Sequence, residues 1–177
     1  MRLFFALWPP ESLSRALAGK ADALACRFGG KPARRETIHL TLAFLGEVAV
    51  ARLPAVLDAG RRVAAASFDL VVDRFGGWRH NRLLWAGCAE PADGLRSLVA
   101  RLREELRAAS IAMDAAPRFA PHLTLVRKAG IVSADVETLL PEPLLWPCSD
   151  FVLVHSRPAA SGREYAILES FGLTGTG

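Results

Sequence analysis

The 177-residue sequence lacks the long apolar runs and targeting segments that would place it in a membrane or outside the cell. No apolar run approaches the roughly 20 residues that a transmembrane helix needs. The apolar start, residues 1–8, stops at Pro9-Pro10 and is too short for the core of a signal peptide. We therefore expect a cytoplasmic protein with no membrane contact and no obligate protein partner.

Cysteine is scarce, and Cys26, Cys88 and Cys148 are far apart, with no Cys-x-x-Cys pair. An odd number of scattered cysteines gives no basis for a disulfide framework or a zinc site. The sequence also has no obvious cluster of carboxylates that could hold a metal ion. We therefore expect reduced thiols, no metal and no cofactor.

The remaining composition is that of an ordinary globular protein, with 51% apolar and 23% charged residues. The net charge of +4 suits an anionic partner, but many enzymes of small molecules are equally basic. No linker or low-complexity tract divides the chain, so residues 1–177 are expected to form a single domain.

The hydrophobic period changes repeatedly between about 2 and about 3.6 residues, which indicates an α+β structure. Helices are expected near residues 9–29, 50–66 and 95–106, and Pro54 fits the second helix only within its first turn. The third helix is expected to carry an apolar stripe of Leu95, Leu98, Val99, Leu102 and Leu106. The last two expected strands form a hairpin across residues 157–162. Strands are expected at residues 1–8, 37–45, 68–75, 82–89, 119–126, 150–156 and 164–170.

The most informative feature is a repeated tetrapeptide, His-Leu-Thr-Leu, at residues 39–42 and again at residues 122–125. The two copies start 83 residues apart and contain two of the four histidines in the chain. On a strand, residues two apart share a face, so His39 and Thr41 project together, as do His122 and Thr124. The intervening leucines project the other way and anchor each motif.

Two imidazoles and two hydroxyls that face one another suit displacement at phosphorus. Histidine, with an ordinary pKa near ~6.5, can accept a proton from water or donate one to a leaving oxygen. Threonine hydroxyls can donate to the non-bridging oxygens. A lone His-x-Thr is more often a core histidine, but a structural role gives no reason for the pair to recur. A paired-histidine metal site would want a third ligand, and neither His80 nor His155 has suitable spacing, so neither is assigned a role.

The paired His-x-Thr-x motifs resemble those of the 2H phosphoesterase superfamily. Over essentially its whole length the chain is similar to the bacterial and archaeal RNA 2′,3′-cyclic phosphodiesterases, also called 2′-5′ RNA ligases. The resemblance rests on both motif blocks, residues 34–46 and 119–128. It also rests on the first strand, on Leu84-Trp85-Ala86-Gly87, and on Tyr165 in the terminal hairpin.

That resemblance implies a bilobal α+β fold, in which two antiparallel sheets flanked by helices surround a central cleft. Each of the two pseudo-symmetric lobes would supply one motif. It implies metal-independent hydrolysis of an RNA 2′,3′-cyclic phosphate end to a 2′-phosphate, reversible in principle as 2′-5′ ligation. His39 would be the proton donor and His122 the proton acceptor. Thr41, Thr124 and Arg127 would bind the phosphate, and for Arg127 a solvated strand end is the alternative.

Two other functions remain open at this point. The same chemistry could act on a different small cyclic nucleotide, or the chain could be a non-catalytic RNA-binding module that grips phosphate. Phe5, Trp8 and Trp78 are candidates for stacking on a ribose or base, although core packing is the better expectation for Phe5. The sequence alone does not order the two histidines, because the motifs are identical.

Overall fold

The structure, a computed structural model, describes residues 1–114, 119–130, 136–160 and 162–175. Three α-helices and nine strands lie within these residues. The helices are α1 (Glu11–Phe28), α2 (Leu53–Arg62) and α3 (Asp93–Ala108). The strands are β1 (Arg2–Leu7), β2 (Lys31–Pro32), β3 (Leu40–Glu47), β4 (Phe68–Trp78), β5 (Leu83–Gly87), β6 (His122–Arg127), β7 (Val136–Cys148), β8 (Asp150–Ala159) and β9 (Gly162–Gly172).

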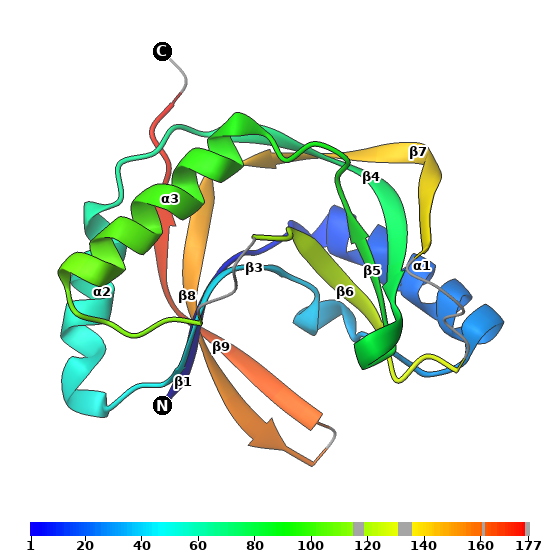
Figure 1. Ribbon diagram of the computed structural model, residues 1–177, viewed down its shortest axis with the longest axis horizontal. Coiled ribbons are helices and arrows are strands. Elements are labelled where there is room, and N and C mark those ends of the chain that lie inside the picture. Colours follow the sequence, from blue (N-terminus) through cyan, green and yellow to red (C-terminus); the bar gives the residue numbers. More distant parts are fainter. Residues whose placement is uncertain (115–118, 131–135, 161, 176–177) are drawn as a thin grey trace.

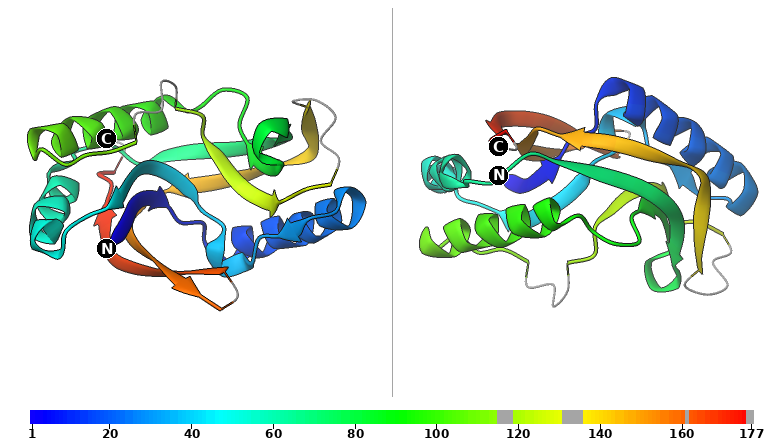
Figure 2. Two further views of the ribbon diagram at one scale, coloured as in Figure 1. Left: turned by 60° about the horizontal axis from the view of Figure 1, so that its bottom comes forward. Right: turned by 90° about the horizontal axis from the view of Figure 1, so that it is seen from above.

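The strands form one strongly curved antiparallel sheet in the order β7-β4-β5-β6-β3-β1-β8-β9, and β2 pairs separately with β6. Helices α2 and α3 pack together at one side of the molecule, whereas α1 lies at the other side against β6 and β2 (Figure 1). The connecting end of the β8–β9 hairpin points away from α2 and α3, whereas the far end of β9 contacts α2 (Figure 2). The expected α+β class is confirmed.

The two strands that carry the repeated motif, β3 and β6, are neighbours at the middle of this sheet. Within the described residues their ladder consists of one residue pair, Leu40 with Leu123. The two sheets implied by the resemblance are therefore joined into one sheet, and the Leu40–Leu123 pair between β3 and β6 is where they join. We call this junction the seam.

The core lies between the curved sheet and the helices. Leu3, Phe5 and Leu7 alternate along β1 and are fully buried there, because every second side chain of a strand faces the same way. Helix α3 buries the expected apolar stripe in full, which comprises Leu95, Leu98, Val99, Leu102 and Leu106. These contacts hold the motif-bearing strands against a rigid base.

The 13-residue strand β7 was not expected from the sequence. Its Pro141, Pro143 and Pro147 interrupt the strand pattern, since proline cannot donate to a ladder. Strand β7 lies at an edge of the sheet, which is where proline is tolerated. The short strand β2 was also missed, because two residues carry no period.

Several expected boundaries shift. The helix expected at residues 50–66 is a 3-10 turn, Val50–Arg52, followed by the shorter α2, with Pro54 in the first turn as expected. The terminal hairpin is longer than expected and pairs Ala159 with Gly162, while Ser161 of the predicted connection lies outside the described residues.

Candidate active site

Both motifs show the same alternation of burial. Leu40 and Leu42 are 1% and 2% exposed, and Leu123 and Leu125 are fully buried. The histidine and threonine of each motif are only partly buried. The strand period therefore separates an apolar anchoring face from a polar face, as the sequence predicted.

The polar faces meet at one cavity of about 430 Å³. It brings together all five residues that the sequence singled out for catalysis and phosphate binding. Their neighbours in the lining come mainly from β1 and from the β8–β9 hairpin. The lining residues are Arg2, Phe4, His39, Thr41, Phe44, Leu83, His122, Thr124, Arg127, Ser156, Arg163 and Tyr165.

The seam fixes how the four polar groups face one another. Leu40 pairs with Leu123 in an antiparallel ladder. Continuing this register by one residue in each direction puts His39 opposite Thr124 and Thr41 opposite His122. This extended register would set each imidazole beside the hydroxyl of the other motif, and both motifs line the one cavity.

The same local hydrogen bond orients both imidazoles. Nδ1 of His39 is 2.8 Å from the carbonyl oxygen of Thr37, and Nδ1 of His122 is 2.8 Å from the carbonyl oxygen of Ala120. A carbonyl oxygen only accepts, so Nδ1 carries the hydrogen in each ring. In the neutral ring Nε2 therefore keeps the lone pair, which is the form that a general base requires.

The surroundings lower the proton affinity of both rings. Burial lowers the pKa of His39 to about 4, and the positive charge of Arg127 adds to this effect, while the hydrogen bond to Thr37 opposes it. The pKa of His122 is also lowered by burial, with Arg127 acting in the same direction. Both lowered pKa values favour the neutral form of each ring near pH 7.

Aromatic side chains surround the two histidines unequally. Trp8 stacks on His39, with ring centroids 5.5 Å apart and planes 4° apart, and Phe4 and Tyr165 also contact this ring, at 4.8 Å and 5.2 Å. In the part of the chain that the structure describes, His122 has one such neighbour, Trp78, at 4.6 Å in an edge-on arrangement. Two proposed base-stacking residues, Trp8 and Trp78, thus contact the histidines themselves.

The third proposed stacking residue, Phe5, is fully buried and packs on Phe151 and Phe171. Core packing was the preferred expectation for this side chain and is confirmed. Being on the other face of β1 from Phe4, it cannot reach the cavity.

Four polar residues of the cavity had been given no role in the site from the sequence. Arg2 shares a face of β1 with Phe4, and its guanidinium lies 4.6 Å from the ring centroid of Phe44. The alternation along β1 could have signalled Arg2. Ser156, Arg163 and Tyr165 come from β8 and β9, and no local pattern indicates that this hairpin reaches the motifs.

Within the described ranges, no group of three His, Cys, Asp or Glu side chains is placed to hold a metal ion. His155 lies on β8 opposite Leu3, and His80 packs near Trp78, so neither histidine joins the cavity. No helix in the described part of the chain is long and apolar enough to cross a membrane.

Comparisons with known proteins identify the family of this chain. The family described as LigT-like phosphoesterase matches residues 7–85. The RNA 2′,3′-cyclic phosphodiesterase of Escherichia coli K12 is 30% identical, over 98% of this chain and 97% of its own length. The enzyme of the same name from Thermus thermophilus is 33% identical, over 99% of this chain and 91% of its own length.

Solved structures extend the likeness to the fold. E. coli LigT complexed with 3′-AMP superposes with a TM-score of 0.87 at 28% identity, covering 98% of both chains. A Thermus thermophilus structure superposes with a TM-score of 0.81 at 33% identity, covering 99% of both chains. The fold and the paired motifs define a two-histidine phosphoesterase. More particularly, the chain belongs to the LigT-like family, whose curated members are named RNA 2′,3′-cyclic phosphodiesterases.

Proposed function

We propose that this protein hydrolyses the 2′,3′-cyclic phosphate at an RNA 3′ end and leaves a 2′-phosphate. His122 accepts a proton from the attacking water, and His39 donates a proton to the departing 3′ oxygen. The hydroxyls of Thr41 and Thr124, together with Arg127, hold the non-bridging oxygens. Water forms the new P–O bond, the P–O3′ bond breaks, and one proton passes through each imidazole.

The observation that carries this proposal is that two identical motifs line one cavity with the same orientation of both rings. In-line displacement needs a base and an acid on opposite sides of phosphorus. A proton transfer of this kind typically contributes about 10²- to 10⁴-fold in rate. Donors aimed at the non-bridging oxygens, where charge grows, stabilise the transition state further.

The lowered pKa of His39 is compatible with its role as donor. An imidazolium of low pKa is a strong acid, which helps expulsion of an alkoxide. In the empty cavity this ring is neutral near pH 7, because its pKa is about 4. A bound phosphodiester brings a negative charge that stabilises the imidazolium and raises that pKa. The substrate therefore supplies the charge that keeps the donor protonated.

A second candidate substrate is a small cyclic nucleotide. A cavity of about 430 Å³ has the size of a ligand pocket, and a related structure was solved with 3′-AMP. A non-catalytic grip on RNA phosphate is the other alternative. We also propose a cytoplasmic location without an obligate partner, which fits the free thiols of Cys26, Cys88 and Cys148.

The test is hydrolysis of an oligonucleotide ending in a 2′,3′-cyclic phosphate, in EDTA, by wild type, His39→Ala and His122→Ala. The product is identified as a 2′- or 3′-phosphate by chromatography against standards. We expect wild-type turnover to the 2′-phosphate and loss of turnover in both variants, with binding of the substrate weakened far less.

His155→Ala is the matched control. This side chain lies one residue before Ser156 and therefore on the opposite face of β8 from the cavity. It should retain full activity. Binding without turnover by the wild type would contradict the proposal and favour the RNA-binding module, and abolition by EDTA would contradict the metal-independent chemistry.

A further inference from the structure

We propose that the RNA strand on the 5′ side of the cyclic phosphate lies in a basic groove beside the cavity, so that the preferred substrate is an oligonucleotide. This inference rests on the proposed function. The cyclic phosphate occupies a 3′ end, so all further phosphates of the strand lie on its 5′ side. The molecule must therefore offer them one path away from the cavity.

The groove has a volume of about 410 Å³ and is continuous with the cavity. Thr124, Arg127, Arg163 and Tyr165 line both, so a strand leaving the cavity on this side enters the groove directly. The remaining lining comes from β2, from the residues after it, from the residue that follows β6 and from the β8–β9 hairpin: Lys31, Pro32, Ala33, Arg34, Thr37, Lys128, Ala160 and Gly162.

The groove concentrates positive charge. Arg127 pairs with Lys31 across the β2–β6 ladder and is followed in the chain by Lys128, so three exposed cations are adjacent. Among the described residues that line the groove, none is Asp or Glu. Cationic side chains that neutralise phosphates supply most of the sequence-independent affinity for nucleic acids.

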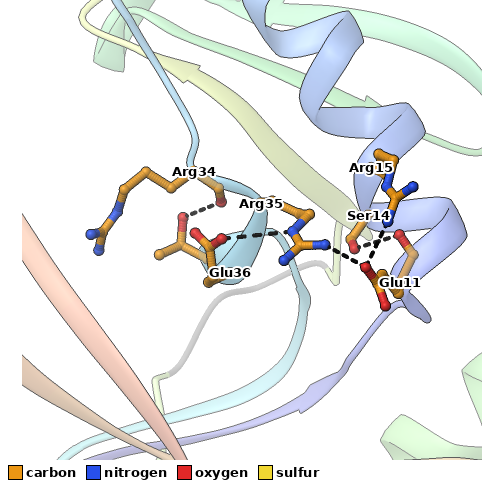
Figure 3. A network of polar contacts seen from close by, with 7 residues as sticks. Glu11, Ser14, Arg15, Arg34, Arg35 and Glu36 are labelled. Atoms are coloured by element: carbon orange, nitrogen blue, oxygen red, sulfur yellow. Dashed lines mark hydrogen bonds and ion pairs between the residues drawn. The ribbon is translucent and has the colours of Figure 1, made fainter.

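Arg15 and Arg35, which lie nearby, differ from the groove lysines because carboxylates neutralise their charges. Glu11 lies between Arg15 and Arg35, with carboxylate contacts of 2.7 Å and 2.8 Å, and Arg35 also contacts Glu36 (Figure 3). In the part of the chain that the structure describes, neither Lys31 nor Lys128 has such a partner. The two lysine ammonium groups thus remain available to an anion.

The backbone at Lys128 is held in an unusual conformation. Lys128 and Arg82 both have left-handed backbones, with φ of 57° and 54°. They are joined by a clamp in which Arg82 Nε donates to the carbonyl of Ala129 at 2.8 Å and the Ala129 amide donates to the carbonyl of Arg82 at 2.9 Å. Such strained residues persist when surrounding contacts hold them, and they concentrate at functional sites. Here the clamp holds the Lys128 position beside the groove.

The other side of the cavity is less suited to phosphates. A third hollow there, of about 290 Å³, shares Thr41, Phe44 and His122 with the cavity. It is lined largely by apolar side chains and includes the carboxylate of Asp114. Its one cation, among the described lining residues, is Arg103, which lies over the ring of Phe119.

The experiment compares substrates of increasing length: a 2′,3′-cyclic mononucleotide, and a dinucleotide and a tetranucleotide with the same end. The enzymes are wild type, the double variant Lys31→Gln/Lys128→Gln, and the control Arg103→Gln, which removes one charge on the other side. Circular dichroism and thermal unfolding check that each is folded. The readout is the ratio of kcat/KM for the tetranucleotide to that for the mononucleotide, at several salt concentrations.

We expect the ratio of the two kcat/KM values to be about ten or more for the wild type. For the lysine variant the ratio should be close to one. For single strands, the slope of log affinity against log salt changes by about 0.7 for each phosphate contact. The lysine variant should therefore lose about 1.4 from the slope measured with the tetranucleotide, if each lysine contacts one phosphate. Arg103→Gln should keep the wild-type ratio.

The inference would be overturned if the wild-type ratio were one. It would also be overturned if Arg103→Gln lost the high ratio and the lysine variant kept it. Either result would leave the proposed function intact. If the wild type hydrolyses no cyclic phosphate, the proposed function fails instead. Fluorescence anisotropy with a labelled 3′-phosphorylated tetranucleotide then decides the groove separately. Weaker, less salt-dependent binding by the lysine variant supports the groove, and unchanged binding rejects it.

Discussion

The two His-Leu-Thr-Leu motifs are identical in sequence and in local hydrogen bonding, yet their histidines have different neighbours. His39 lies among the rings of Trp8, Phe4 and Tyr165, whereas the one aromatic ring in contact with His122, among the described residues, is that of Trp78. The backbone carbonyl two residues earlier orients both rings alike. The motif therefore sets the tautomer, and distant segments of the chain set the proton affinity.

This difference in surroundings supports the proposal that one copy of the motif supplies an acid and the other a base. Aromatic rings that cover an imidazole remove water and disfavour its charged form, which lowers the pKa. His39, with the more complete cover, has a pKa of about 4 in the empty cavity. The following predictions test whether the two motifs are different in function as well as in surroundings.

The largest effect should come from removing either imidazole. His39→Ala and His122→Ala should each lower kcat on the cyclic phosphate by about 10²- to 10⁴-fold, because each loses a proton transfer. A 3′-deoxynucleoside 2′-(4-nitrophenyl phosphate) has a leaving group that needs no proton. On this substrate His39→Ala should keep most of its activity, whereas His122→Ala should not. Steady-state kinetics measures both, and the opposite pattern would exchange the two roles.

The next largest effect should come from the hydroxyls. Thr41→Val and Thr124→Val each remove one donor to the phosphate oxygens, which typically costs about 10²-fold or more in kcat. The losses should be similar, because both threonines line the same cavity from the polar face of their motif. Thr→Ser variants are the matched controls and should retain activity. A loss confined to one threonine would show that the phosphate is held by one motif.

Gly76→Ala should disturb the surroundings of His122 alone. A Cβ at this position would overlap the indole of Trp85, which packs on Trp78 at a centroid distance of 5.5 Å, and Trp78 contacts His122. Overpacking typically costs about 1–3 kcal/mol of stability. Urea unfolding should show that loss, and the NMR signals of His122 should move more than those of His39. Gly172→Ala is the control, since no atom lies near its added Cβ.

The smallest effect is a selective change in proton affinity. Trp8→Ala uncovers His39, so the pKa of His39 should rise from about 4 toward its ordinary value of about 6.5, while the pKa of His122 stays as it was. Titration of the imidazole signals by NMR measures both. Inorganic phosphate should raise the pKa of both rings in the wild type. Equal shifts of both histidines in Trp8→Ala would contradict the assignment of the cover to His39.

Local periodicity predicted a large part of this molecule. The alternation in residues 39–42 and 122–125 gave the polar and apolar faces of both motif strands, and the apolar stripe of α3 was correct at every position. The missed strand β7 shows the limit, since its prolines suppress the local strand signal and only its place at the edge of the sheet accommodates them. A local pattern contains no information about such a place.

The residues of the site also fall into a group that the sequence could predict and a group that it could not. The four motif side chains could be predicted because they share two short segments. The aromatic cover of His39 could not, because Phe4 and Tyr165 come from opposite ends of the chain and meet only through the pairing of β1 with β8 and of β8 with β9. Arg163 reaches the cavity by the same route.

The seam also has a mechanical consequence. Between β3 and β6, within the described residues, the two halves of the sheet share a single rung at Leu40 and Leu123. Rotation of rigid bodies about a pivot displaces each atom in proportion to its distance from that pivot. His39, Thr41, His122 and Thr124 are the immediate neighbours of the rung, whereas β7 and β9 lie at the far edges. A rotation of the two halves about this rung would therefore displace the outer strands furthest and leave the spacing of the four motif side chains nearly constant.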